Sequence, residues 1–354
     1  MSTPSRNPLR VLLAAFLVLA LAVTVAACGD DDKKSDTGSS TAAAASTGPD
    51  KIIVGYQAIP NGDLIVKHNK WLETAFPDAQ IEWKLFDSGG SVNEAVAADS
   101  IDFGLAGSSP VSRGLSTPIP YQVPWIFDVI GKAEALVVKS DITSIADLKG
   151  KKIATPLAST SHYSLLAALQ ENGLSEKDVK IIDAEPDDIY AAWSRGDIDG
   201  AYVWNPNLAK ITKDGGKVLI TSEDLAKKGK TTYDLAVVAN SFADKYPEAV
   251  TTWAAQQNKA VEEIKNDPDK AAADVAAELN IPAADAKAQI ADLIFLDATE
   301  QIGPDYLGGG LAKNLYAAAQ FNKELGQIPS VKPEADYAAA VKKEYAAGAA
   351  KQER

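Results

Sequence analysis

Three stretches of small residues each follow an expected strand and open an expected helix. They are Asp87–Ser91, Gly107–Pro110 and Ala158–Tyr163. The first turn of a helix leaves backbone N–H groups unpaired and carries partial positive charge, so it favours an anion. A single Ser or Thr there is usually only a helix cap. Three such loops at the carboxyl ends of strands, where α/β sheets place ligands, favour a site for a small anion.

The side chains of these loops are therefore the first candidates for ligand contact. They are Ser88, Gly89, Ser108, Ser109, Thr160, Ser161, His162 and Tyr163. Aromatic rings at Tyr56, Trp125, Tyr163 and Trp204 could pack against an aliphatic ligand stem, although core packing explains each equally well. Trp204 is preferred because it closes a strand and precedes Asn205.

A carboxylate could neutralise an amine on the same ligand. Asp234 is the preferred candidate because it begins an apolar strand, 233–239, that we expect to border the cleft. Asp128 and Asp87 also fall in linker or loop positions. Most acidic residues are solvated surface groups, so these two are weaker candidates.

Catalytic constellations are missing from the sequence. The chain has two histidines, His68 and His162, and one cysteine, Cys28. No Ser-His-Asp order, Walker loop or HExxH motif occurs. The acidic residues of 183–188 are explained by a helix start at Pro186. We therefore expect a binding protein rather than an enzyme, with no cofactor and no metal.

Short apolar runs alternate with amphipathic runs from Lys51 onward, which is typical of βαβ units with parallel strands. A second α/β set lies inside the first. The sequence predicts lobe 1 over 51–136 plus 233–354 and lobe 2 over 137–232. The strands 135–139 and 233–239 would cross between the lobes as a hinge, with the ligand in the cleft.

The N-terminal segment has the pattern of an export signal. Arg6 and Arg10 precede an apolar run, Val11–Val23, that is too short for a membrane span of about 20 residues. Val25–Gly29 is similar to a bacterial lipobox, which predicts a signal peptide over 1–27 and a lipidated Cys28. Residues 28–50 would be a disordered tether. We expect an exported protein, anchored to the outer face of the cell membrane through Cys28.

The net charge of −13 argues against nucleic acid as a partner, because binding phosphates requires a basic face.

Several runs resemble the sulfonate, nitrate and taurine binding proteins of bacterial importers, most specifically their taurine branch. These runs are Phe86–Gly89, Gly107–Pro110, Glu134–Lys139, Thr160–Leu169 and Ala191–Trp204. The resemblance extends from about Lys51 to the C-terminus.

This resemblance implies a two-lobed Venus-flytrap fold of the type II periplasmic binding proteins, with taurine or a related sulfonate in the cleft. It also implies an ABC permease and its ATPase as partners, and a monomer. The helix-start loops would hold the sulfonate and a carboxylate would hold the ammonium. Asp234 matches the acid of the family's returning strand.

Two segments, Ile59–Asp63 and Pro118–Asp128, depart from the family pattern and leave the ligand open. An alkanesulfonate, nitrate or bicarbonate would need no acid for an amine, and glycine betaine would favour an aromatic cage. A pyrimidine-precursor synthase of related fold would need clustered histidines and a cysteine-rich stretch, and both are absent. A sensory module that reports its ligand without transport also stays open.

Overall fold

The computed structural model describes residues 48–352. The expected signal peptide, Cys28 and nearly all of the expected tether lie outside the described residues. The described residues 48–352 belong to one compact unit. Within residues 48–352, none of the helices combines the length and apolar character that a membrane crossing requires.

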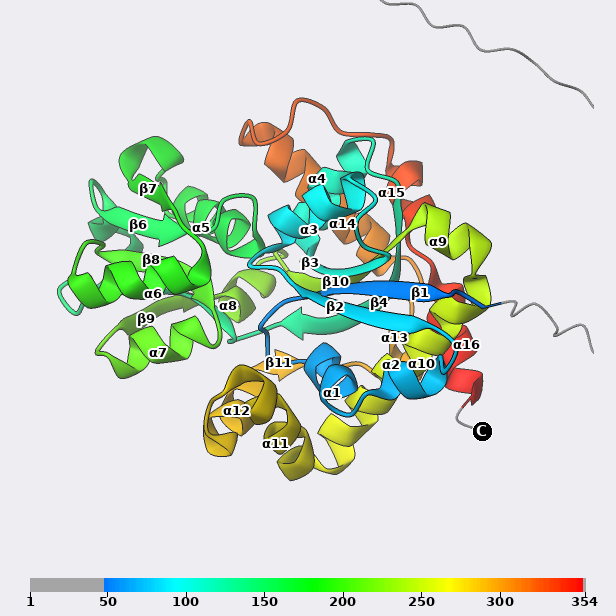
Figure 1. Ribbon diagram of the computed structural model, residues 1–354. Helices are drawn as coiled ribbons and strands as arrows, with labels where there is room; N and C mark the ends of the chain where they lie inside the picture. The colour runs from blue at the N-terminus through cyan, green and yellow to red at the C-terminus, as the bar shows by residue number, and fades with distance from the viewer. Residues whose placement is uncertain (1–47, 353–354) are drawn as a thin grey trace, which may run out of the picture. The chain divides into compact units, whose positions relative to one another are not determined.

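The first of two sheets has six strands in the order β11-β4-β10-β3-β1-β2 (Figure 1). Its strands are β1 (Lys51–Tyr56), β2 (Gln80–Leu85), β3 (Phe103–Gly107), β4 (Tyr121–Ile130), β10 (Tyr233–Ala239) and β11 (Leu293–Ile294). β1 is parallel to β2 and β3, whereas β10 is antiparallel to both β3 and β4. This sheet is the centre of lobe 1.

The second sheet has five strands in the order β7-β6-β8-β5-β9 and is the centre of lobe 2, coloured green in Figure 1. Its strands are β5 (Glu134–Val138), β6 (Lys152–Thr155), β7 (Lys180–Asp183), β8 (Gly200–Trp204) and β9 (Lys217–Thr221). The chain builds this lobe between β4 and β10, so both strands that flank the insertion lie side by side in the first sheet.

Helices connect the strands of both lobes, as the alternating pattern predicts. Those of lobe 1 before the insertion are α1 (Gly62–His68), α2 (Trp71–Ala75), α3 (Gly89–Ala97) and α4 (Ser108–Ser116). Those of lobe 2 are η1 (Ile145–Leu148), α5 (Thr160–Glu171), η2 (Glu176–Asp178), α6 (Pro186–Arg195), α7 (Asn207–Lys213) and α8 (Ser222–Ala226).

After β10 the chain is almost wholly helical. The helices are α9 (Asn240–Lys245), α10 (Pro247–Asn266), α11 (Pro268–Leu279), α12 (Ala283–Ile290), α13 (Ala298–Gln301), α14 (Gly310–Glu324), α15 (Glu334–Ala340) and α16 (Lys343–Gln352). Trp253 of α10 stacks on Phe103 of β3 with ring centroids 4.8 Å apart, and its ring also meets the edge of Phe127. This helix therefore covers the centre of the first sheet.

Each of the two strands expected at the hinge forms, and each pairs within one sheet. β5 pairs with β8 and β9 along its length, so residues 134–136 lie in lobe 2 rather than in lobe 1. β10 pairs only with β3 and β4. The chain passes between the lobes just before these strands, in residues 131–133 and 227–232. The strands are fully buried, and pairing within one sheet satisfies their backbone groups.

The β4–β10 pairing contains a bulge that a distant side chain holds in place. Asp234 pairs with Asp128 and Leu235 with Ile126, so Phe127 is an extra residue on β4. The buried Gln301 side chain accepts a hydrogen bond from Ile126 N at 2.8 Å and donates one to Ile126 O at 2.9 Å. It thereby satisfies buried backbone groups of the residue next to the bulge.

Gln301→Leu should destabilise the protein by about 2–4 kcal/mol, because it leaves the buried N–H and C=O of Ile126 without partners. Urea unfolding followed by tryptophan fluorescence would measure the loss. Gln170→Leu is the control, because Gln170 forms an exposed hydrogen bond to Glu324 and should cost less than about 0.5 kcal/mol. A Gln301→Leu cost no larger than the control's would contradict this role.

Candidate functional site

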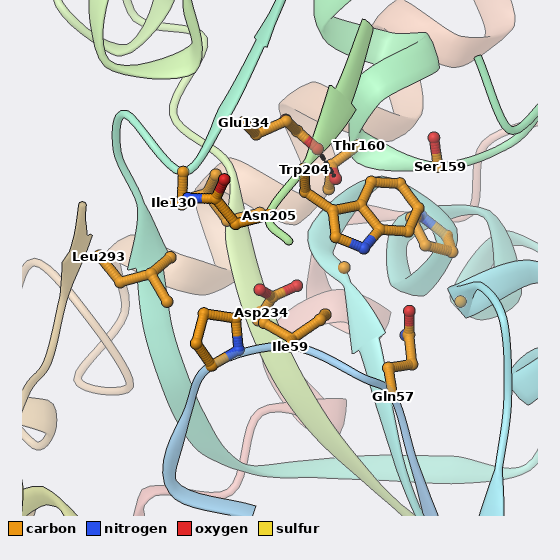
Figure 2. A pocket seen from close by; sticks show the side chains of 15 residues that line it. Gln57, Ile59, Ile130, Glu134, Ser159, Thr160, Trp204, Asn205, Asp234 and Leu293 are labelled. Atoms are coloured by element: carbon orange, nitrogen blue, oxygen red, sulfur yellow. Dashed lines mark hydrogen bonds between the residues drawn. The ribbon is translucent and has the colours of Figure 1, made fainter. Parts of the chain in front are cut away.

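A cavity lies between the two lobes and receives side chains from both (Figure 2). Its empty space is about 430 Å³, including the part open to solvent. Lobe 1 contributes Gln57, Ile59 and Asp234, and lobe 2 contributes Thr160 and Trp204. The cavity is thus placed where the sequence analysis expects the ligand.

Three helix starts meet at this cavity. Gly89 is the first residue of α3, Gly107 is the N-cap of α4, and Ser159 and Thr160 are the N-cap and first residue of α5. The first-turn N–H groups of a helix have no partner inside it and carry partial positive charge. Three such helix ends at one cavity make its polar side suitable for an anion.

The lobes touch each other at the same place. A Cβ atom on Gly107 of lobe 1 would lie 2.5 Å from Cγ2 of Thr160 of lobe 2. The Ser88 hydroxyl of lobe 1 donates a hydrogen bond to the Glu185 carboxylate of lobe 2 at 3.2 Å. Glycine at 107 is therefore what permits α4 and α5 to approach this closely.

Glu134 lines the lobe 2 side of the cavity and is fully buried. One carboxylate oxygen accepts hydrogen bonds from Thr160 at 2.6 Å and Ser161 at 2.8 Å, and the other from Ser222 at 2.7 Å and Ser164 at 3.4 Å. Burial raises the pKa of Glu134, and these hydroxyls oppose that rise. Its acceptor capacity is largely used within the protein.

Asp234 lies on the lobe 1 side, with its carboxyl group pointing into the cavity (Figure 2). Burial raises the pKa of Asp234 to about 7, and the charge of Glu134 adds to this, while a hydrogen bond with Asp128 opposes it. Asp128 lies behind Asp234 and is completely buried. Its burial is the main cause that raises its pKa well above the usual range, and the charge of Asp234 is the second. Two acids of lobe 1 therefore lie one behind the other, with Asp234 at the cavity wall and Asp128 behind it.

The remaining walls are mostly apolar. Ile59, Pro60, Ile130 and Leu293 lie on the lobe 1 side, and the Trp204 indole lies across from them. These groups suit a short aliphatic stem between an anionic end and a cationic end. Within residues 48–352, no group of His, Cys, Asp and Glu has the arrangement of a metal site.

Of the ten ligand residues expected from the sequence, Gly89, Thr160, Trp204 and Asp234 line the cavity. Three others are buried just behind it and bond to protein groups. Ser88 reaches Glu185, Ser161 reaches Glu134, and the Ser108 hydroxyl accepts a hydrogen bond from Tyr233 N at 3.2 Å.

The other three lie further into the lobes. Ser109 accepts a hydrogen bond from Asn322 at 3.4 Å, and the Tyr163 ring packs edge-on against Phe321 of α14. Nδ1 of His162 accepts a hydrogen bond from Ala158 N at 3.3 Å. Burial, with a further effect from the charge of Arg113, lowers the pKa of His162 to about 4. Ligand contact by any of the ten stays a prediction.

Several cavity residues were not expected from the sequence: Gln57, Ile59, Pro60, Glu134 and Asn205. Glu134 carries a recognisable signal, since it is a single acid at the head of the apolar strand β5. Ile59 and Pro60 belong to a loop expected near the mouth of the cleft, but apolar residues in a loop do not reveal that they face the ligand.

Comparisons with known proteins identify a family. The family model described as NMT1/THI5 like matches residues 76–271. The taurine-binding periplasmic protein of Escherichia coli K12 is 39% identical over 259 residues, which cover 72% of this chain and 80% of that protein.

Two solved structures share the fold. The alkanesulfonate-binding protein from Xanthomonas axonopodis pv. citri, bound to MOPS, has a TM-score of 0.71 at 24% identity and covers 83% of this chain and 99% of its own. A desulfurization enzyme has a TM-score of 0.62 at 16% identity, covering 86% and 100%. At these identities the likenesses concern the fold alone, and they confirm the two-lobed type II fold expected from the sequence.

Gly107→Ala should weaken ligand binding about tenfold, because the added methyl group collides with Thr160 when the lobes meet. Calorimetry with taurine, the ligand in the name of the E. coli relative, would measure the change. Thr160→Ser removes Cγ2 but keeps the hydroxyl that reaches Glu134, so the double variant Gly107→Ala/Thr160→Ser should recover most of the affinity. Loss of affinity in the double variant equal to that in Gly107→Ala would contradict a steric cause.

Proposed function

Since this chain belongs to the NMT1/THI5-like family, we propose that it is the exported solute-binding protein of an ABC importer and captures taurine or a closely related small sulfonate in its cleft. The observation that carries this proposal is that helix starts and an acid meet at one cavity. The starts of α3, α4 and α5 line it, and so does the buried Asp234, which pairs with Gly107 at the start of α4. A small zwitterion matches that combination.

The sulfonate would lie against the starts of α3, α4 and α5. Its three oxygens can accept several hydrogen bonds, and the partial positive charge of three helix ends offsets its charge without any buried cation. Thr160 and Ser161 would act mainly through their backbone N–H groups, because their hydroxyls are committed to Glu134.

The ammonium would lie on Asp234. Glu134 also faces the cavity, but its oxygens already accept hydrogen bonds from four hydroxyls. The carboxyl of Asp234 points into the cavity, and among the described residues Asp128 is the hydrogen-bond partner that acts on it. An ammonium has three N–H donors and needs acceptors of this kind when it leaves water.

The known relatives support the same ligand class. The E. coli relative is a taurine-binding protein, and the Xanthomonas structure of the same fold is an alkanesulfonate-binding protein. Glycine betaine fits less well, because among the aromatic residues of the described chain only Trp204 lines the cavity and a cage needs several rings. Nitrate and bicarbonate would leave Asp234 without a cationic partner.

An enzyme on this fold is the alternative from another class, and the desulfurization enzyme shows that the fold supports catalysis. The chain's single cysteine, Cys28, lies outside residues 48–352, and His162 is buried with a lowered pKa. His68 lies beside Glu278, and neither lines the cavity. The cavity thus offers acids and N–H groups, which suit capture without chemistry.

Capture would proceed by closure. A ligand that contacts both lobes binds the closed arrangement better than an open one and shifts the population toward it. An ABC permease and its ATPase would then recognise the closed monomer at the membrane. A sensing role would use the same closure, and gene neighbours that encode a permease and an ATPase would favour transport.

Asp234→Asn should weaken taurine binding about 30- to 100-fold, because a charge-assisted hydrogen bond to the ammonium is lost. Ethanesulfonate, which is taurine without the amine, should bind the variant at least as well as it binds the unchanged protein. Calorimetry with both ligands would test this, with Asp78→Asn as a control on an exposed acid. Equal losses for the two ligands would remove Asp234 from this role.

The lipid anchor is a separate part of the proposal, and it rests on the lipobox-like sequence around Cys28. Cys28→Ser should release the protein into the medium, since a diacylglyceryl group supplies the two chains that stable anchoring requires. Membrane fractionation and incorporation of labelled palmitate would measure the effect. A Cys28→Ser chain that stays with the membrane would contradict the anchor.

A further inference from the structure

Asp128 and Asp234 form a buried acid pair. They are directly opposite each other in the antiparallel strands β4 and β10, so their side chains emerge on the same face of the sheet. Asp128 is completely buried and Asp234 is only 6% exposed. The bulge at Phe127 sets this pairing, because without the extra residue the side chain of residue 128 would emerge on the opposite face.

Within residues 48–352, the Asn61 side chain is the one donor that acts on the Asp128 carboxyl, and it reaches neither oxygen with hydrogen-bond geometry. The charged groups that act on the two carboxyls are each other and Glu134, and no cation of the described chain is among them. Two adjacent buried carboxylates cannot both stay ionised without a cation. A proton on Asp128, donated to Asp234, satisfies both groups at once.

We propose that Asp128 holds a proton for Asp234, and that this pair lets the cleft adjust its charge to the ligand. The proposal rests on the sulfonate-binding function given above. With one proton, the pair carries one negative charge and matches a ligand that has an ammonium group. With two protons, it is neutral and tolerates a sulfonate that has no amine. Asp128 is thus a positioning residue that acts through Asp234.

The two ligand types should show opposite pH dependence. The pKa of Asp234 is raised to about 7. Below that pH, most ligand-free molecules therefore hold a second proton on the pair. An ammonium displaces this proton, so the affinity for taurine rises with pH. A sulfonate without an amine requires the proton, so its affinity falls as pH rises through the same range.

Other acids of the region have to be separated from the pair. Glu134 of β5 faces the acid pair, and its carboxylate accepts hydrogen bonds from four hydroxyls. Burial raises the pKa of Asp63 on α1 to about 7, but its carboxylate accepts a hydrogen bond from Gln257 and does not line the cavity. Burial also raises the pKa of Asp292, which lies near Asn205 and Lys132. Asp63→Asn therefore serves as a control that should leave both slopes unchanged.

The two segments that depart from the family pattern meet at this pair. Asn61 belongs to the first segment and Asp128 ends the second, and the Asn61 side chain acts on the Asp128 carboxyl. Both are buried. One residue of each segment therefore lies directly behind the group assigned to the ligand's ammonium.

Calorimetry in buffers of different ionisation enthalpy, between about pH 5.5 and about pH 8, would test the proposal. For taurine, we expect the affinity to increase by up to about tenfold per pH unit at the acidic end, with release of a proton. For ethanesulfonate, we expect the opposite slope, with proton uptake. Asp234→Asn should abolish both linkages.

Variants at Asp128 give the decisive comparison. Asp128→Leu removes the donor, so the pH at which both affinities change should move up by about one unit. Asp128→Asn keeps an N–H donor to Asp234 and should restore a profile close to that of the unchanged protein. Slopes of the same sign for the two ligands, or an unchanged profile in Asp128→Leu, would overturn the proposal.

A ligand-free measurement separates this proposal from the proposed function. Carbon-13 NMR of labelled aspartate carboxyls should show a group that titrates near pH 7, is absent in Asp234→Asn, persists in Asp63→Asn and shifts further upward in Asp128→Leu. If neither sulfonate binds but this titration is seen, the proposed function fails and the proton-holding pair stands. If both sulfonates bind but Asp234 titrates at its ordinary pKa, the pair fails and the function stands.

Discussion

The antiparallel pairing of β4 with β10 is the constraint on which the rest of the molecule depends. These strands enter and leave the inserted lobe, so their pairing returns the chain to the first sheet after lobe 2 is built. The bulge at Phe127 fixes which residues of the two strands face each other. Gln301, contributed from far along the chain, bonds to the backbone of Ile126 beside that bulge. The position of the cleft acids therefore depends on packing well outside the cleft.

A second constraint links the lobes away from the cavity. Helix α14 packs against α4 of lobe 1, while Phe321 and Ala318 belong to the apolar core that contains Leu136 and Tyr163 of lobe 2. Asn314 of the same helix also donates to Thr231 O in the second crossing segment. Because one helix is shared between two cores, opening of the lobes has to be accommodated by α14 and by the two crossing segments.

The sequence predicts the three helix starts at the cavity because their signals are local. A strand followed by small residues and a helix start is visible within a few residues, and all three such loops contribute to one cavity. The two-lobed fold follows from the same alternation, and the comparisons confirm it.

The pair of buried acids is harder to predict, because it depends on register. Asp128 and Asp234 are 106 positions apart in the chain, and only a bulged strand pairing places them together. No periodicity in the sequence indicates a bulge or the glutamine that supports it. Glu134 is hidden for a related reason, since its four hydroxyl partners come from two helices, α5 and α8.

The buried acids also lower the free energy of unfolding at neutral pH. Asp63, Asp128 and Asp234 have raised pKa values, so the folded state holds more protons than the unfolded state between about pH 4 and about pH 7. Stability therefore falls as pH rises through that range. A neutral core at these positions would avoid this cost, as replacements of buried charges in other proteins show. The ammonium of a bound ligand would offset the charge of the cleft acids. Ligand binding would therefore remove part of this cost and stabilise the closed, folded protein.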